Sequence, residues 1–336
     1  MAEALEAEAI QVGVDPHVLV VPELELAEKM ILAACASQVP AVSLGAAHVM
    51  RAGGKRLRPL IVILVARLCG LQEVERPARL GAAVELIHTA SLVHDDVVDE
   101  SDRRRGHETV NVFFGNEASV LMGDYLVCRA LRMIAEEPDL LLMREICDVI
   151  VSMCEAEVLQ IAYRGDIENT FDNYLHVIRN KTACLFSFAA RASARVARAS
   201  NFTIERLGVF GMNLGMAFQI VDDILDLLGK EQELGKPIAC DLREGKFTYP
   251  VLHAISCARG EERSELLSLL GNTVALTNLQ VERVIEIVKD TGGFQSAYDT
   301  AIAYGDQAMS ALVPLPDGPA RRGLQSLVGR VIQRHF

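Results

Sequence analysis

Two stretches decide the fold and the chemistry of this chain: LIHTASLVHDDVVD at residues 86–99 and FGMNLGMAFQIVDDILD at residues 210–226. Each is a mostly apolar run that ends in the pattern DDxxD. The aspartates of the two patterns are Asp95, Asp96 and Asp99, and Asp222, Asp223 and Asp226. On a helix, positions i and i+4 lie on one face. We therefore expect the first and last carboxylates of each pattern to project in parallel.

The two acidic clusters predict a metal site. Like charges stacked on one helix face repel each other, and more strongly where they are partly buried, so they need a cation. A single DDxxD is as readily a solvated helix end. Two copies, each after an apolar helix, favour two carboxylate walls that face each other across a cavity. Hard oxygen ligands with few other donors indicate Mg²⁺, completed by water and phosphate oxygens.

The rest of the chain predicts an all-α fold. Long amphipathic segments alternate with short turns, and no stretch has the sustained period-two alternation of a strand, so a sheet is not expected. The expected helices are 25–37, 40–52, 58–69, 77–101, 115–135, 139–163, 170–198, 203–228, 247–258, 263–270, 278–290, 293–312 and 318–334. Residues 1–22 are expected to be a partly ordered leader, and residues 23–336 a single domain, since no breaker resembles a linker.

Composition excludes several classes of protein. The net charge of −12 disfavours nonspecific nucleic-acid binding. The eight cysteines show no CxxC pairing, which fits a reduced cytoplasmic compartment and disfavours a zinc cluster. The N-terminus lacks the positive start of a secretory signal, and the longest apolar runs are too short to span a membrane. The high apolar content of 51% must therefore be internal, in a large core or around an apolar cavity.

Basic groups follow each acidic cluster or precede it. GGKRLRP at 53–59 offers glycine amides and arginines to an anion. The alternative is that this segment is an ordinary exposed basic loop. Arg103–Arg105 follow the first cluster, where pairing with Glu100 and Asp102 is the alternative. Further basic positions are Lys181-Thr182, Lys236 and Lys246. Each lysine alone would be taken for a surface residue, and it is the order acid, base, acid, base along the chain that favours a binding role. Of the two histidines near the first cluster, His88 is expected to donate to phosphate and His94 to be structural.

These motifs resemble the trans-prenyl (polyprenyl) diphosphate synthase family, and most of all the bacterial octaprenyl and decaprenyl synthases. The resemblance rests on GGKRLRP, ELIHTASLVHDDVVDESDRRRG, GNEASVLMGDYL, NKTA, GMAFQIVDDILDLLG and GKPIACDLREGKFTYP, in the family's order. They span residues 51–250, about three-fifths of the chain. The only departure is Arg103, at a variable position.

The resemblance implies a fold and a set of roles. The fold would be a large helical bundle of the isoprenoid synthase type with a central active-site cavity, commonly a homodimer. The six aspartates would hold Mg²⁺ against an allylic diphosphate such as farnesyl diphosphate. The residues implied to contact that diphosphate are Arg104, Lys181, Thr182, Gln219 and Lys236. Those implied to hold isopentenyl diphosphate are Gly54, Lys55, Arg58, His88 and Arg105.

The implied reaction is successive head-to-tail condensation. Diphosphate would leave the allylic substrate, stabilised by Mg²⁺ and the basic residues, and the double bond of isopentenyl diphosphate would attack the resulting allylic cation. A proton would then be lost, to the departed diphosphate itself in one reading. Ala90 and Ser91 precede Asp95 by about one turn, where an aromatic residue stops elongation early in the family. Because both are small, a long product is expected, with Leu131 as a floor residue. The resemblance to octaprenyl and decaprenyl synthases implies that this product supplies quinone side chains. Small residues that merely allow close helix packing are the alternative.

Four other functions stay open from the sequence. A farnesyl or geranylgeranyl synthase differs only in product length. A class I terpene cyclase would lack the second DDxxD and GGKRLRP, and it would have more aromatic residues. A non-catalytic partner subunit would lose one aspartate cluster. A helical scaffold leaves the phosphate-type loops unexplained. A transient membrane contact on product release also stays open.

Overall fold

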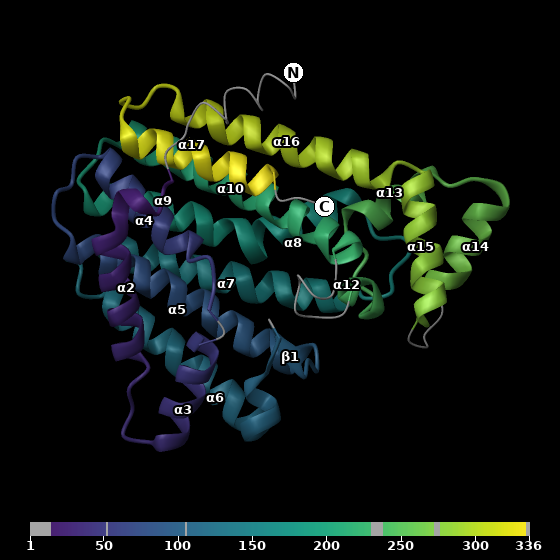
Figure 1. Cartoon of the computed structure of the whole chain (residues 1–336), viewed down its shortest axis with the longest axis horizontal. Coiled ribbons are helices and arrows are strands. Elements are labelled where there is room, and N and C mark those ends of the chain that lie inside the picture. Colours follow the sequence, from purple (N-terminus) through teal and green to yellow (C-terminus); the bar gives the residue numbers. More distant parts are fainter. Residues whose placement is uncertain (1–14, 52, 105, 230–237, 272–275, 334–336) are drawn as a thin grey trace.

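The computed structural model describes residues 15–51, 53–104, 106–229, 238–271 and 276–333, and these residues are almost entirely helical (Figure 1). The N-terminal helices are η1 (Val18–Val20), α2 (Val21–Ala34), α3 (Pro40–Arg51), α4 (Leu57–Leu68), α5 (Glu75–Val98) and α6 (Val110–Ile134). The middle helices are α7 (Leu140–Ala162), α8 (Phe171–Ile178), η2 (Arg179–Ala183), α9 (Cys184–Val196), α10 (Asn201–Leu228) and α12 (Cys240–Arg243). The C-terminal helices are α13 (Tyr249–Cys257), α14 (Gly260–Leu270), α15 (Asn278–Asp290), α16 (Gly293–Leu312) and α17 (Pro319–Ile332). The expected all-α fold is confirmed.

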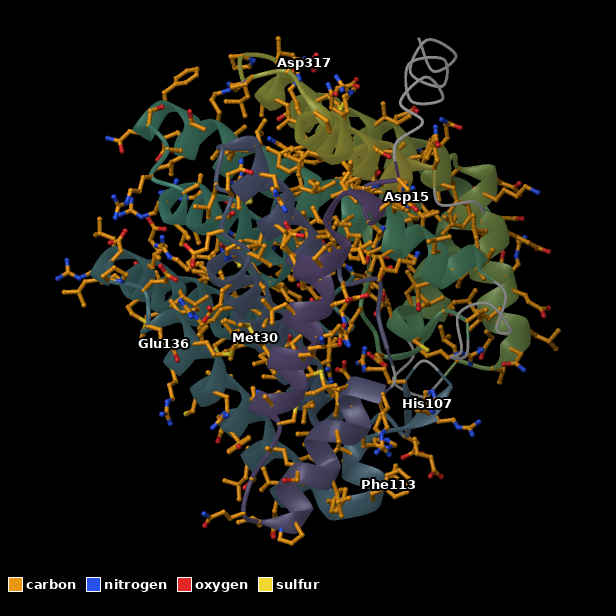
Figure 2. All side chains as sticks on the ribbon, turned by 60° about the vertical axis from the view of Figure 1, so that its left-hand side comes forward. Asp15, Met30, His107, Phe113, Glu136 and Asp317 are labelled. Carbon is orange, nitrogen blue, oxygen red and sulfur yellow. The ribbon has the colours of Figure 1, made fainter. Side chains whose placement is uncertain are left out.

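The two aspartate-bearing helices lie inside the bundle. Helix α5 packs against α2, α4 and α6, and α10 packs against α9 and α16. In Figure 1, α16 and α17 run together along the upper edge, while α14 and α15 stand at the right-hand end. Figure 2 shows Phe113, near the start of α6, at the opposite end of the molecule from Asp317, which precedes α17. Within the described ranges, no helix combines the length and apolar character needed to cross a bilayer.

The core explains why these segments are helical and where they sit. Helix α4 is apolar on all sides, and Leu60–Val65 are 0% exposed, as expected for a helix surrounded by others. Helix α10 joins two apolar clusters. Its first half, including Phe210, packs with α4, α5 and α9, and its second half, including Ile224, packs with α13, α15 and α16. The second DDxxD therefore emerges from a rigidly held helix.

One glycine sets the closest approach of α9 and α10. A Cβ added to Gly211 would lie 2.4 Å from the backbone oxygen of Phe186. Only glycine allows two helix backbones to meet this closely. This contact brings the end of η2, which carries Lys181 and Thr182, beside α10.

Several helix boundaries differ from the expected ranges by a few residues, and two of the differences have backbone reasons. The segment expected as one helix at 170–198 contains a π-helical turn, η2, between α8 and α9. Such turns insert a residue into the helix and are frequent at functional sites. Helix α6 starts at Val110 and contains a kink at Gly115, whose φ of 80° is accessible mainly to glycine. The helix start expected at residue 115 coincides with this kink, and the helix itself begins five residues earlier.

The expectation that the chain has no sheet is wrong in one small place. Strands β1 (Arg103–Arg104) and β2 (His107–Glu108) form a minimal antiparallel ribbon in which Arg104 pairs with His107. A two-residue strand is too short to show alternation in the sequence. The ribbon turns the chain back immediately after the first aspartate cluster.

Candidate active site

Both aspartate clusters line one large cavity. The cavity has a volume of about 1820 Å³, and Asp95 and Asp99 line it together with Asp222, Asp223 and Asp226. The remaining members of the expected site that line it are Gly54, Lys55, Arg58, His88, Arg104, Lys181, Thr182 and Gln219. Residues from five separate segments of the chain therefore meet at one place.

The first cluster holds its carboxylates in ion pairs. Asp96, which is buried, accepts a hydrogen bond of 2.6 Å from Nε of Arg104 on the β-ribbon. Asp99 accepts from Nη2 of Arg164 at 2.5 Å and from Nζ of Lys246 at 2.8 Å. Two of the three carboxylates are thus already oriented by fixed cations.

Asp95, the remaining carboxylate of this cluster, is largely buried, and none of its ion pairs within the described part of the chain is as close, so its charged form is disfavoured. Burial raises the pKa of Asp95 to about 6, and the charge of Glu157 raises it while that of Lys181 lowers it. Nζ of Lys181 lies 3.8 Å from Oδ2 of Asp95, pairs with Glu157, and donates to Oε1 of Gln160 at 2.7 Å. A divalent cation at this position would remove the penalty of burying the Asp95 charge.

The second cluster is held by neutral hydrogen-bond donors. The hydroxyl of Tyr174 donates to Oδ2 of Asp223 at 2.6 Å, and Nε2 of Gln219 donates to Oδ1 at 2.7 Å. Thr182 in turn donates to Oε1 of Gln219 at 2.8 Å. Burial and the charge of Asp241 raise the pKa of Asp223 well above its ordinary value. This cluster, too, has an excess of buried negative charge.

The end of the second cluster is tied to the segment that follows it. Asp226 is buried and accepts from the backbone N–H of Asp241 at 3.1 Å. Lys246, which joins Asp99 of the first cluster, also lies 2.7 Å from Glu244. The segment 240–246 therefore links the two aspartate walls.

The basic loop, residues 53–59, runs into the first turn of α4 and forms another wall. Arg58 is buried, and its guanidinium carbon lies 4.5 Å from the ring centroid of Phe186. The stacked ring fixes the guanidinium plane, which is the arrangement in which arginine recognises oxyanions. Lys55 is exposed, and His88 on α5 is half-buried, and both line the cavity.

The length-related residues are placed differently from one another. Ser91 lines the cavity. Ala90 is fully buried in the core, and Leu131 is partly buried against the same core rather than lining the cavity. Arg105 and Lys236 lie outside the described residues.

His94 was assigned a structural role, and its ring Nε2 does lie 3.1 Å from the backbone oxygen of Val120 on α6. It also contacts Asp124 at 3.5 Å.

Sequence reasoning missed several residues that hold the site in place. These are Glu157, Gln160, Arg164, Tyr174, Asp241 and Glu244. Glu157 and Gln160 lie three positions apart on an expected helix, so their shared face was detectable. Arg164 and Tyr174 are single residues whose partners lie 65 and 49 positions away, and no local pattern marks them. Asp241 and Glu244 lie in the motif GKPIACDLREGKFTYP, but their roles were not predicted from the sequence.

The donor set fits magnesium. Both clusters offer carboxylate oxygens, the hard ligands that Mg²⁺ prefers. Among the described residues, no three His, Cys, Asp or Glu side chains converge closely enough to hold a metal by themselves. That arrangement suits an ion that takes one or two carboxylates and completes its shell with water and diphosphate oxygens.

Comparison with known proteins agrees with this geometry. The polyprenyl synthetase family model matches residues 40–288. The chain belongs to the polyprenyl synthetase family. It is 39% identical over 289 residues to the octaprenyl diphosphate synthase of Escherichia coli, covering 85% of this chain and 88% of that one. It is 37% identical over 299 residues to an all-trans-nonaprenyl-diphosphate synthase of Rhodobacter capsulatus, covering 89% and 90%.

Solved structures give the same result for this family member. A polyprenyl synthase from Caulobacter crescentus, complexed with calcium and isoprenyl diphosphate, superimposes with a TM-score of 0.91 at 35% identity, covering 95% of this chain and 97% of that one. The isoprenoid synthase type of bundle and a prenyltransferase activity expected from the sequence are thus confirmed. The roles of the individual site residues remain predictions.

Proposed function

We propose that this protein is a long-chain trans-polyprenyl diphosphate synthase that condenses isopentenyl diphosphate repeatedly onto an allylic diphosphate such as farnesyl diphosphate. One observation carries the proposal. Asp95 and Asp99 of the first DDxxD cluster, all three aspartates of the second, the basic loop and Lys181 line the same cavity of about 1820 Å³. Relatives named octaprenyl and nonaprenyl diphosphate synthases support the long-chain class.

The chain's own residues would divide the work between two diphosphates. Bound Mg²⁺ would neutralise the departing diphosphate, held by Asp95, Asp96 and Asp99 on one side and Asp222, Asp223 and Asp226 on the other. Arg104, Lys181, Thr182, Gln219 and Lys236 would orient the allylic diphosphate. Gly54, Lys55, Arg58, His88 and Arg105 would hold isopentenyl diphosphate. Placing both substrates in one orientation supplies much of the rate enhancement of such an enzyme.

The cavity wall beyond the aspartates suits a hydrocarbon chain. Ile87, Ser91, Val127, Ile150 and Met153 line the cavity from α5, α6 and α7. Apolar walls exclude water, which protects an allylic cation from capture. We propose that Ala90 and Ser91 leave room for elongation and that Leu131 marks the floor. The shorter-chain alternative keeps some support, because a geranylgeranyl diphosphate synthase of Saccharolobus solfataricus is 38% identical over 296 residues.

Two further properties are proposed with the activity. A homodimer is supported by an apolar face on neighbouring helices, where Leu121 of α6 and Val158 of α7 are each 66% exposed. Val151 and Ile161 extend the same face of α7. A cytoplasmic location is supported by the eight cysteines, all of which are free thiols. Residues 23–336 are proposed to form one domain.

The test is product analysis. Purified protein is incubated with Mg²⁺, labelled isopentenyl diphosphate and farnesyl diphosphate, and products are resolved by chromatography and mass spectrometry. Asp95→Asn in an otherwise identical protein serves as the inactive control. Octaprenyl, nonaprenyl or decaprenyl diphosphate as the product, the lengths named for the relatives, supports the proposal. Geranylgeranyl diphosphate as the end product would replace it with the shorter-chain alternative. Hydrocarbon without diphosphate would indicate a cyclase, and no turnover would indicate a partner subunit.

A further inference from the structure

Arg56 stands in the middle of the basic loop, between Lys55 and Arg58, and it has an unusual backbone. Its φ of 46° and ψ of 39° place it in the left-handed region at the N-cap of α4. Residues other than glycine rarely adopt this conformation, and it persists only where surrounding contacts enforce it.

The guanidinium of Arg56 is committed to two carboxylates of the protein. Nε pairs with Oε1 of Glu28 on α2, and Nη2 donates to Oε2 of the same residue at 3.3 Å. Nη1 donates to Oε1 of Glu85 on α5 at 3.2 Å. The Arg56 side chain is only 16% exposed. Three of its nitrogens thus tie the loop to two helices.

Glu85 connects this clamp to the active cavity. Like Arg56 itself, it lines the cavity, its side chain is 6% exposed, and it stands three residues before His88 on the same helix. Its second oxygen, Oε2, is buried and has no hydrogen-bond partner among the described residues. A buried carboxylate with one paired oxygen is costly, and the Arg56 pair is what compensates it.

We propose that Arg56 is a positioning residue and not a diphosphate ligand. Its clamp on Glu28 and Glu85 holds the loop so that Lys55 and Arg58 face the cavity. The clamp therefore sets the affinity for isopentenyl diphosphate and leaves the affinity for the allylic diphosphate unchanged. This inference rests on the proposed function, because it assigns the basic loop to the isopentenyl diphosphate subsite.

The decisive experiment is calorimetric titration of the full chain with isopentenyl diphosphate in the presence of Mg²⁺ and without allylic substrate. No turnover occurs under these conditions, so binding is measured alone. Arg56→Gln is expected to raise Kd about tenfold or more, and Arg56→Lys, which keeps the charge and loses the planar fork, by about threefold to tenfold. Glu85→Gln should raise Kd as well. In the double variant Arg56→Gln/Glu85→Gln, Kd should rise by less than the product of the two single increases, because both substitutions break the same ion pair.

Arg67→Gln is the matched control. Arg67 pairs with Glu23, so it joins α4 to α2 just as Arg56 does, but at the other end of α4. Removing it is expected to lower the melting temperature without changing Kd for isopentenyl diphosphate. A change in Kd for Arg56→Gln but not for Arg67→Gln separates loop positioning from general docking of α2.

Steady-state kinetics complete the test. For Arg56→Lys, KM for isopentenyl diphosphate should rise while KM for the allylic diphosphate stays within about twofold. The inference is overturned if Arg56→Gln and Arg56→Lys both bind isopentenyl diphosphate as the wild type does, or if both KM values rise equally. It is also overturned if the wild-type chain does not bind isopentenyl diphosphate. If the wild type binds it but makes no prenyl product, the proposed function fails while the Kd comparison still decides the role of Arg56.

Discussion

Lys246 joins the two walls of the site, and replacing it with methionine tests how much that link stabilises the fold. Its Nζ lies 2.8 Å from Asp99, which is 147 positions earlier in the chain, and 2.7 Å from Glu244. Its side chain is 7% exposed. Burial lowers the pKa of this amine, but the charges of Asp241, Asp99 and Glu244 outweigh burial and raise it above its ordinary value. Lys246 is therefore a charged group inside the protein.

The expected size of the effect follows from what the substitution leaves behind. Removing one partner of a buried ion pair costs about 3–5 kcal/mol. Arg164 still neutralises Asp99 in Lys246→Met, so the cost should be near the lower end, about 3 kcal/mol. In a chain of this size each kcal/mol lowers Tm by about 2 °C, which gives a decrease of about 6 °C.

The assay is thermal melting followed by circular dichroism at pH 8, with Arg283→Met as the control. Arg283 makes ion pairs of similar length, 2.8 Å to Glu265 and 3.1 Å to Glu286, but on the surface, so its loss should hardly change Tm. Equal Tm values for Lys246→Met and Arg283→Met would refute the reasoning.

The loss of stability in Lys246→Met should depend on pH through Glu244 and should be smaller in acid. Burial raises the pKa of Glu244 above its ordinary 4.5, and Lys246 opposes that rise. Without Lys246 the folded-state pKa of Glu244 rises further. The unfolded chain then loses the Glu244 proton at lower pH than the folded one, so stability falls as pH rises from 4.5 through the folded pKa. The Tm difference from wild type should therefore shrink in acid.

Three other substitutions test separate parts of the account. Tyr174→Phe removes the 2.6 Å hydrogen bond to Asp223, and a bond to a charged group is worth about 1.5–3 kcal/mol. The kcat/KM for the allylic diphosphate should therefore fall about 10- to 150-fold, and an unchanged value would contradict the role of Tyr174. Ser91→Phe should shorten the product seen by chromatography, because Ser91 lines the cavity, whereas unchanged length would refute the tunnel assignment. Burial tends to raise the pKa of Glu137, but hydrogen bonds from Arg76 and Arg79 lower it overall. Glu137→Gln should therefore lower Tm at pH 7, and the difference from wild type should vanish as pH falls below 4.5 through the folded pKa; a constant difference would count against this ion pair.

The sequence predicted the parts of the site that are encoded locally. A DDxxD pattern after an apolar run is a local feature, and the spacing of Asp222 and Asp226 follows directly from helix geometry. Asp99 is less regular, since it is the C-cap of α5 with φ of −92° and ψ of 3°, yet it still lines the cavity. The all-helical fold likewise follows from apolar periodicity.

The partners of those aspartates could not be predicted. Asp99 meets Lys246, and Tyr174 meets Asp223 at a separation of 49 residues. Such pairs depend on how whole helices cross, which no local pattern in one sequence records. Arg56 is a sharper case. Its neighbours predict an anion ligand, and only the fold reveals that Glu28 and Glu85 occupy its guanidinium.

The central claim is that two aspartate walls share one diphosphate-binding cavity through divalent ions. The most direct measurement is a crystal structure of the protein with Mn²⁺ in place of Mg²⁺ and inorganic diphosphate, in which anomalous scattering locates the metal. The account predicts metal peaks between α5 and α10, with ligands from Asp95 or Asp99 on one side and Asp222 or Asp226 on the other. Peaks confined to one cluster, or diphosphate bound outside this cavity, would contradict it.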